Sequence, residues 1–158
     1  MNFTVLPRTI IERVLEYRNH PEIRQWMKNQ DVIKPQEHLD FVEKLKFYQQ
    51  DRYWLVQKNH QKTDLGVVYL SQITEVDAEF GIYANPFEMG QGMGTCLANL
   101  GLHIAFQRLG LQTVRLRVVP QNSRAIRLYD RIGFETTETQ DGLNHMVLTS
   151  QSFLQKSC

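Results

Sequence analysis

The sequence has 158 residues, of which 42% are hydrophobic and 22% are charged, so it predicts one globular domain over residues 1–158 and excludes intrinsic disorder as the main state. Eighteen Lys and Arg residues against seventeen Asp and Glu residues leave a net charge of +1. This balance excludes a protein that binds nucleic acid or an anionic membrane by charge alone. With no long apolar segment, and with Cys96 and Cys158 expected as free thiols, a cytoplasmic protein is expected.

Strand and helix patterns follow one another through the first half of the sequence. The expected order is a strand, three helices and three strands, over residues 2–6, 9–17, 23–27, 36–49, 53–57, 65–73 and 78–84. In the fourth of these segments His38, Phe41, Val42, Leu45 and Tyr48 share one helical face, which we expect to cover a sheet. The last three strands are expected to form an antiparallel meander.

The second half begins with a glycine-rich segment that opens a helix. This helix is expected to run from the glycines at 90–94 to about Leu109, before a strand over 113–119 and a helix over 123–132. Two strands over 134–138 and 145–149 close the chain across a turn at 140–142. No internal repeat or linker divides the sequence, so all these segments are expected in one domain. Their mixture of helices and strands predicts an α/β fold class.

The glycine-rich segment is Met89-Gly90-Gln91-Gly92-Met93-Gly94, between an expected strand and an expected helix. Glycines at alternate positions let consecutive backbone N–H groups point into one concavity, and the helix that begins at Gly94-Thr95 adds its positive dipole end. Such a concavity binds phosphate. The segment is neither a Rossmann fingerprint, which would follow the first strand of a parallel sheet, nor a P-loop, which would end in Gly-Lys-Ser/Thr. A flexible turn with glycines for tight packing is the alternative.

A second motif lies further along the chain and reads Asn122-Ser123-Arg124-Ala125-Ile126-Arg127-Leu128-Tyr129, followed by Gly133-Phe134. In order and spacing, the two motifs resemble those of the GNAT superfamily of acyl-CoA-dependent N-acetyltransferases. The resemblance implies acetyl-CoA as co-substrate, no metal, and a mixed, mostly antiparallel sheet of about seven strands flanked by helices, with acetyl-CoA bound where two strands diverge. Met89 departs from the family pattern, in which Arg or Gln is usual.

The resemblance also implies a set of cofactor contacts, made by the glycine segment, by the second motif and by the backbone of the strand before the glycines. These residues are Ile82, Tyr83, Ala84, Met89, Gly90, Gln91, Gly92, Met93, Gly94, Thr95, Asn122 and Ala125. An Asn at position 122 is alternatively a helix cap.

Two residues are implied as catalytic, in a direct transfer within a ternary complex. Tyr129 would donate a proton to the sulfur of coenzyme A, since a phenol with a reference pKa of about 10 stays protonated at neutral pH. Glu79 stands where some family members carry a general base. The alternatives are a Tyr that only packs on the sheet and a Glu that is solvated or structural.

The acceptor side of the sequence resembles a narrower group, the N-acetyltransferases of the pseudaminic acid pathway, which acetylate the 4-amino group of a UDP-linked dideoxy-altrosamine. The resemblance is in Arg18-Asn19-His20-Pro21, Trp26-Met27, His38-Leu39-x-Phe41 and the segment 81–87. The implied substrate-binding residues are Arg18, Arg24, Trp26, His38, Ser71, Gln72 and Tyr83. Arginine suits a diphosphate, His38 would donate to phosphate or uracil, and aromatic rings would stack on a base or sugar.

Other functions remain open at this point. Protein N-termini or another amino sugar would suit the same fold, and a noncatalytic acyl-CoA-binding module is a second alternative. We expect a monomer or homodimer that binds a small-molecule nucleotide-sugar.

Overall fold

Six strands form one continuous sheet within the described residues, which are 1–58, 62–88, 90 and 92–156 of the computed structural model. The strands are β1 Arg52–Lys58, β2 Thr63–Ser71, β3 Asp77–Ala84, β4 Thr113–Val118, β5 Glu135–Gln140 and β6 Leu143–Thr149. Their order is β1-β2-β3-β4-β6-β5, and only the β3–β4 pair is parallel. The predicted mixed, mostly antiparallel sheet is confirmed, with six strands in place of about seven.

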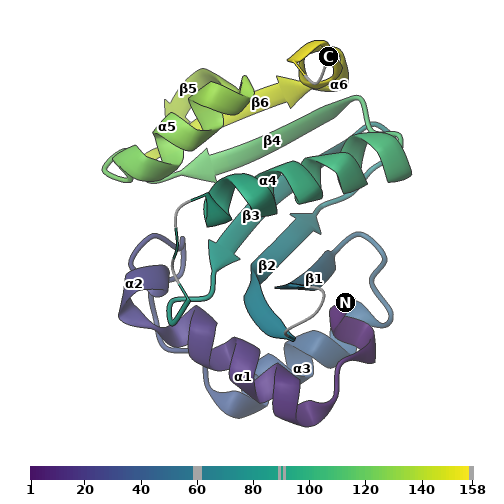
Figure 1. Ribbon diagram of the computed structural model, residues 1–158, viewed down its shortest axis with the longest axis vertical. Coiled ribbons are helices and arrows are strands. Elements are labelled where there is room, and N and C mark those ends of the chain that lie inside the picture. The colour runs from purple at the N-terminus through teal and green to yellow at the C-terminus, as the bar shows by residue number, and fades with distance from the viewer. Residues whose placement is uncertain (59–61, 89, 91, 157–158) are drawn as a thin grey trace.

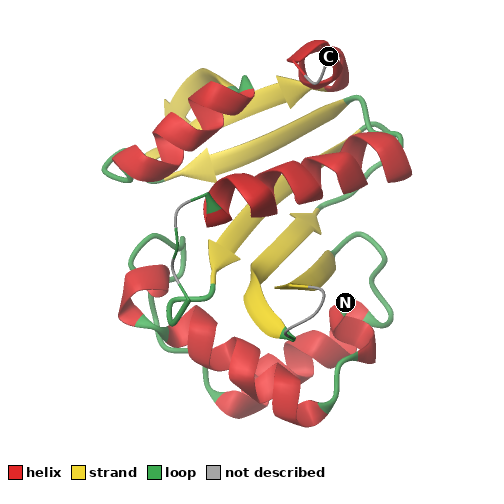
Figure 2. Ribbon diagram, viewed as in Figure 1, coloured by secondary structure: helices red, strands yellow, loops and turns green. Residues whose placement is uncertain are grey.

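Helices pack against both faces of this sheet (Figures 1 and 2). They are α1 Arg8–Asn19, α2 Pro21–Arg24, α3 Pro35–Leu45, α4 Met93–His103, α5 Ser123–Ile132 and α6 Ser150–Lys156, with a short turn η1 Phe3–Val5 and a π-helical turn η2 Ile104–Arg108. Consecutive strand residues face opposite ways, so Val67 lies in one core with Val14 and Val42, while Val68 lies in the other with Leu97. The first core is under α1 and α3, and the second is under α4 and α5.

Gly101 allows α4 to lie close to the sheet. A Cβ atom at this position would be 2.5 Å from Cγ1 of Val68 and 2.6 Å from Cε2 of Phe80. Any side chain would therefore move α4 away from β2 and β3. Gly101, near the C-terminal end of α4, thus permits close packing of this helix on β2 and β3.

The parallel strands β3 and β4 pair over three residues and then diverge. The pairing begins with Asp77 opposite Thr113 and ends with Glu79 opposite Arg115. Beyond this point β3 continues beside β2 to Ala84, whereas β4 continues beside β6. In Figure 1 the arrowheads of β3 and β4 separate at the end where α4 begins. The backbone edges that face each other across this opening do not form ladder hydrogen bonds.

The prediction of a strand over residues 2–6 is wrong. Asn2 makes only an isolated bridge to Trp54, and Phe3–Val5 form a 3₁₀ turn. The side-chain oxygen of Asn2 accepts hydrogen bonds from the backbone N–H and the hydroxyl of Thr4, each at 3.0 Å. Asn side chains that bond two residues ahead favour turns over strands, so this local bond accounts for the difference in strand count.

Two of the predicted helices also differ from the structure. The helix predicted over 36–49 spans Pro35–Leu45, because the N–H groups of Lys46 and Phe47 bond three residues back in a tighter final turn. Tyr48 is 58% exposed, so its placement on the buried face is wrong. The helix predicted to reach Leu109 becomes π-helical after His103, and α6 had no predicted counterpart. The remaining elements are confirmed to within a few residues at their ends.

A buried carboxylate, Asp64, connects α1 to the sheet. Its Oδ2 accepts hydrogen bonds from Nε of Arg13 and the hydroxyl of Tyr17, and its Oδ1 accepts one from Nε2 of Gln57, all at 2.7 Å. Burial alone would raise the pKa of Asp64, but these hydrogen bonds lower it below the usual value of 3.8. The ionised carboxylate thus fixes α1, which carries part of the acceptor side, against β1 and β2.

We expect Asp64→Asn to lower the free energy of unfolding by about 2–3 kcal/mol at pH 7, because hydrogen bonds to a buried charged group are lost. Since the folded-state pKa is the lower one, this stabilisation is present above the unfolded value of 3.8 and is lost as the pH falls through the folded value. Urea unfolding of both proteins across pH 3–7 measures it. Asp40→Asn, at an exposed position of α3, should change stability by less than about 0.5 kcal/mol. A difference that stays constant with pH would contradict this account.

Candidate active site

A cavity of about 550 Å³ lies where β3 and β4 diverge. Its walls come from α2, from residues 80–84 of β3, from the start of α4, from the end of β4 and from α5. Of the predicted cofactor residues, those that line it are Ile82, Tyr83, Ala84, Gly90, Gly92, Met93, Gly94, Thr95, Asn122 and Ala125. Met89 and Gln91 lie outside the described residues. The sequence motifs far apart in the chain therefore meet at one opening in the sheet.

The start of α4 presents backbone donors to this cavity. Gly92 caps the helix with φ of +79°, a left-handed conformation that favours glycine, and its carbonyl accepts the first helical bond from Cys96 at 2.9 Å. The N–H groups of the first turn, at Met93, Gly94 and Thr95, have no carbonyl of the preceding turn to bond. A Cβ at Gly94 would lie 3.3 Å from Leu128, so glycine also permits close contact between α4 and α5. This is the backbone arrangement that binds a phosphate group.

Asn122 lies at the start of α5, and the sequence offered two interpretations of it, a helix cap and a cofactor contact. Its Oδ1 accepts a hydrogen bond from the N–H of Ala125 at 3.3 Å, which caps the helix. The amide Nδ2 is not used by this cap, and the residue lines the cavity. The role of Asn122 as a contact to the pantetheine arm stays a prediction.

Three arginines in the cavity wall were not singled out from the sequence. Arg117 comes from β4, and Arg124 and Arg131 come from α5, whereas Glu22 is the one acidic residue among the wall residues described. Arg124 lies inside the second motif, so its position in the sequence could have indicated a phosphate contact. The sequence holds no comparable signal for Arg117 and Arg131. An excess of positive charge around free helix N–H groups suits a polyanionic ligand such as acetyl-CoA. The residues present therefore fit this co-substrate.

Tyr129 reaches the same cavity from α5 and is 7% exposed. Its ring packs against Phe80 and Phe134, with centroids 6.4 and 5.5 Å away. Burial raises the pKa of Tyr129 far above its usual value of 10.0, so the hydroxyl stays protonated at neutral pH. A protonated phenol in the wall of this cavity is suited to donate a proton there.

A second cavity of about 280 Å³ adjoins the first on the α1 side of the sheet. Met27, Tyr69 and Tyr83 line both cavities. The rings of Tyr53 and Tyr69 stack at 4.7 Å with an angle of 10° between their planes. Gly81 makes room for the ring of Tyr69, since a Cβ there would lie 2.0 Å from its Cζ. The two cavities are therefore neighbours, one at the start of α4 and the other on the face covered by α1 and α3.

Arg18 brings an unpaired charge into this second cavity. Its Nη2 donates to the carbonyl of Asn29 at 2.8 Å, while Nη1 is buried and lacks a hydrogen-bond partner in the part of the chain that the structure describes. Burial lowers the pKa of the Arg18 guanidinium, with the rings of Tyr83, Tyr69 and Tyr53 acting in the opposite direction. A buried guanidinium with a free donor favours an anionic ligand.

His38 also lines the second cavity, but its ring N–H bonds within the protein, whereas the sequence analysis expected it to donate to a ligand. It is 5% exposed, its Nε2 lies 3.1 Å from the carbonyl of Ile11, and burial lowers its pKa below 6.5. A neutral ring that donates from Nε2 leaves Nδ1 as an acceptor. His38 can then accept from a group such as the N–H of a uracil, and it cannot donate to a phosphate through Nδ1.

The segment over residues 25–34 is ordered by the Arg18-Asn19 pair and by Arg24. The amide of Asn19 bonds both the carbonyl and the N–H of Ile33, at 2.9 and 2.8 Å. Arg24 donates to the carbonyls of Asn19 and Gln30, each at 3.1 Å, and lines neither cavity. This makes Arg24 a support of the segment that carries Trp26 and Met27. Trp26, 38% exposed, lines the first cavity.

Three predicted site residues lie elsewhere. Ser71 ends β2, Gln72 follows it, and neither lines either cavity; Gln72 adopts φ of +50°, and its side chain accepts a hydrogen bond from Arg115. Glu79 lies at the last β3–β4 pair and is bound by Arg117. The substrate role of Ser71 and Gln72 and the base role of Glu79 stay predictions.

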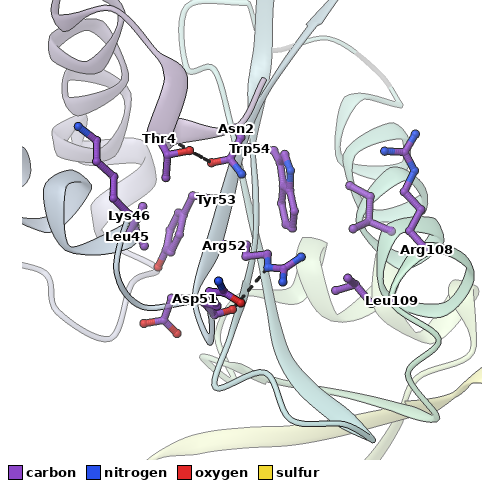
Figure 3. A pocket seen from close by; sticks show the side chains of 12 residues that line it. Asn2, Thr4, Leu45, Lys46, Asp51, Arg52, Tyr53, Trp54, Arg108 and Leu109 are labelled. Atoms are coloured by element: carbon purple, nitrogen blue, oxygen red, sulfur yellow. Dashed lines mark hydrogen bonds between the residues drawn. The ribbon is translucent and has the colours of Figure 1, made fainter.

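A third cavity, of about 710 Å³, lies at the free edge of β1 and shares no lining residue with the one at the β3–β4 opening. Figure 3 shows its side chains on both sides of the β1 edge. Several of its polar groups bond within the protein: Thr4 to Asn2 at 3.0 Å, and Nε of Arg52 to the carbonyl of Gln49 at 3.4 Å. Tyr53 lines both this cavity and the one of about 280 Å³, but no described residue of the glycine segment or of the second motif lines it.

Two further findings concern the described residues only. None of their helices is long and apolar enough to cross a membrane. No group of three or more His, Cys, Asp or Glu side chains within the same residues could hold a metal ion.

The class of protein follows from these features together with a family match. Residues 8–135 match the family model for the acetyltransferase (GNAT) domain, and the chain therefore belongs to the GNAT acetyltransferase family. It is an acetyl-CoA-dependent N-acetyltransferase, rather than a noncatalytic acyl-CoA-binding module.

The chain is similar over most of its length to two known acetyltransferases. Acetyltransferase PseH of Campylobacter jejuni subsp. jejuni serotype O:23/36 (strain 81-176) is 35% identical over 147 residues, which cover 93% of this chain and 90% of that protein. The crystal structure of Campylobacter jejuni N-acetyltransferase PseH in complex with acetyl coenzyme A matches with a TM-score of 0.78 and 28% identity, over 94% and 96% of the two chains. Spermidine N-acetyltransferase from Vibrio cholerae, at 24% identity and a TM-score of 0.86 over 94% and 95% of the chains, shares the fold.

We expect Gly92→Ala to raise the Kd of acetyl-CoA about tenfold. Alanine in the left-handed conformation costs about 1–2 kcal/mol, and rotation of this peptide to relieve the strain turns the first N–H groups of α4 away from the cavity. Isothermal titration calorimetry measures the effect.

Gly110→Ala is the matched control, because Gly110 has φ of +68° and, like Gly92, open space around its Cβ position, but lines no part of this cavity. It should lose similar stability with an unchanged Kd. Equal Kd values for the two variants would contradict the role of Gly92 in the cradle.

Proposed function

We propose that this enzyme acetylates the 4-amino group of UDP-4-amino-4,6-dideoxy-N-acetyl-β-L-altrosamine in pseudaminic acid biosynthesis, a step that would serve flagellin glycosylation. The observation that carries the proposal is Arg18, whose buried Nη1 lacks a partner in a cavity beside the acetyl-transfer site. The 35% identity to acetyltransferase PseH over most of the chain supports the same acceptor.

The charge of the acceptor cavity favours an anionic acceptor. Its described walls contain Arg18 and Lys28 and no carboxylate. A polyamine such as spermidine would bring further positive charge to an unneutralised guanidinium, and like charges brought together without water are unfavourable. A diphosphate offers Arg18 the oxygen acceptors that its free N–H groups require.

The shape of this cavity favours a nucleoside on the same acceptor. Tyr53, Tyr69 and Tyr83 come from three adjacent strands and present aromatic surface beside Arg18. Aromatic side chains bind planar bases and sugar faces. Neutral His38 adds an acceptor that suits the N–H of uracil. The UDP group would then lie in the cavity of about 280 Å³ and its neighbourhood, with the amino sugar directed toward the β3–β4 opening.

Acetyl-CoA, when bound, supplies an acetyl group as a thioester. The N–H groups at the start of α4 and Arg124 and Arg131 would bind its phosphates. The unpaired edge of Ile82–Ala84 would bond its pantetheine arm. Tyr129, which burial keeps protonated, would donate the proton that the departing sulfur needs. Because the two cavities adjoin, both substrates can be bound together, which supports direct transfer without an acyl-enzyme.

We expect Tyr129→Phe to lower kcat about 100-fold and to leave the Kd of acetyl-CoA unchanged, because only the proton donor is removed and the ring still packs on Phe80 and Phe134. Steady-state kinetics and calorimetry measure the two quantities. Tyr48→Phe, at an exposed position, should match the wild type. A wild-type rate for Tyr129→Phe would refute the role of the hydroxyl.

Arg18→Met should raise the KM of the UDP-amino-sugar about 10- to 100-fold, because charge-assisted hydrogen bonds to phosphate are lost while the apolar stem is kept. The KM of acetyl-CoA should stay within about twofold. Arg8→Met, at an exposed position of α1, is the control.

An acceptor panel compares the UDP-amino-sugar, the same sugar without UDP, spermidine, an aminoglycoside and an N-terminal peptide, with release of coenzyme A as the readout. The proposal expects the highest kcat/KM for the UDP-linked sugar. A higher kcat/KM for any cationic acceptor or for the peptide would overturn it.

A further inference from the structure

Two ion pairs cross from β3 to β4, one within the paired region and one where the strands begin to separate. Arg115 Nη1 lies 2.9 Å from Asp77 Oδ2. Arg117 binds Glu79 at two points, with Nε donating to Oε1 at 2.5 Å and Nη2 donating to Oε2 at 3.1 Å. Side-on pairing of this kind fixes both the distance and the orientation of the two groups.

The register of the strands gives these pairs different positions. Asp77 is opposite Thr113 and Glu79 is opposite Arg115, so each arginine stands two residues beyond the partner of its carboxylate. The Asp77 pair therefore lies across strands that are still hydrogen-bonded. The Glu79 pair joins the last paired residue of β3 to a residue of β4 beyond the pairing, and it is the interaction that spans the beginning of the opening.

Arg117 also lines the cavity of about 550 Å³ at the β3–β4 opening. Arg117 lines this cavity together with Gly81 and Tyr69, and its side chain is 34% exposed, whereas the Glu79 side chain is 14% exposed. Both Glu79 oxygens accept hydrogen bonds from the guanidinium. The carboxylate is thus held side-on by a residue of the neighbouring strand, which is the geometry of a structural contact between β3 and β4.

We infer that Glu79 and Arg117 form an ionic clamp that sets the separation of β3 and β4 where the two strands begin to diverge, and that Glu79 is a positioning residue in place of the general base predicted from the sequence. The inference rests on the acetyl-CoA site described above and does not depend on which amine is the acceptor. Its consequence is that binding of acetyl-CoA depends on the presence of both paired charges.

The test uses the single variants Glu79→Gln and Arg117→Gln and the charge-exchanged double variant Glu79→Arg with Arg117→Glu, all in the full chain. Each single variant should raise the Kd of acetyl-CoA about tenfold and lower kcat. The double variant should recover most of both, with a kcat/KM pH profile that has the wild-type shape. Asp77→Asn is the control, because Asp77 lies two residues before Glu79 in the paired region. It should change the Kd of acetyl-CoA less than Glu79→Gln does.

Three results would overturn the clamp. One is a wild-type Kd for acetyl-CoA in Glu79→Gln together with a lost rate, which identifies a proton acceptor. Another is a double variant as impaired as the single ones in Kd and kcat, or one that does not fold. The third is single variants that match the wild type. Because the Kd of acetyl-CoA is measured without acceptor, the clamp can fail while the proposed acceptor stands, and the acceptor can fail while the clamp stands.

Discussion

The short parallel pairing between β3 and β4 is the constraint on which the rest of the site depends. Only three residue pairs join the strands before they diverge. Hydrogen bonds that would otherwise be made between the strands are left to a ligand, since backbone polar groups removed from water require partners. Gly101 sets α4 close to β2 and β3, and the first turn of α4, with its free N–H groups, lines the cavity at the opening. A site for a phosphate-bearing thioester thus arises mainly from backbone geometry.

Charge at the site is local and does not reflect the chain as a whole. The protein has a net charge of +1, yet the described walls of the two adjoining cavities contain five basic residues and one acidic residue: Arg117, Arg124, Arg131, Arg18 and Lys28 against Glu22. Two carboxylates near the site are already paired, Glu79 with Arg117 and Asp64 with Arg13. With Arg117 paired, the positive charge of Arg124, Arg131, Arg18 and Lys28 is available to anionic ligands on both sides of the opening, which agrees with an anionic co-substrate and supports an anionic acceptor.

Local signals in the sequence predicted the elements that local interactions stabilise. The helix over Ser123–Ile132 was predicted with its observed limits, because Asn122 caps its start and Gly133, with φ of +120°, ends it. The 3₁₀ turn at Phe3–Val5 and the early end of α3 each depend on two local hydrogen bonds, which leave no periodic pattern in the sequence. The Glu79–Arg117 pair depends on the register of two strands separated by α4, and the donor state of His38 depends on a carbonyl of α1. The spacing of the two motifs predicted the cofactor residues that line the cavity. The Glu79–Arg117 pair and the hydrogen bond of His38 could not be predicted in this way, because they join segments that are far apart in the sequence.

The central claim is that two adjoining cavities bind acetyl-CoA and an anionic nucleotide at the same time. Calorimetric titration of UDP into the enzyme, with and without saturating coenzyme A, tests it most directly. The account predicts that UDP binds with a similar Kd in both experiments and that binding weakens as salt is raised, because Arg18 supplies a charge-dependent contact. Displacement of coenzyme A by UDP, or no binding of UDP in either experiment, would contradict it.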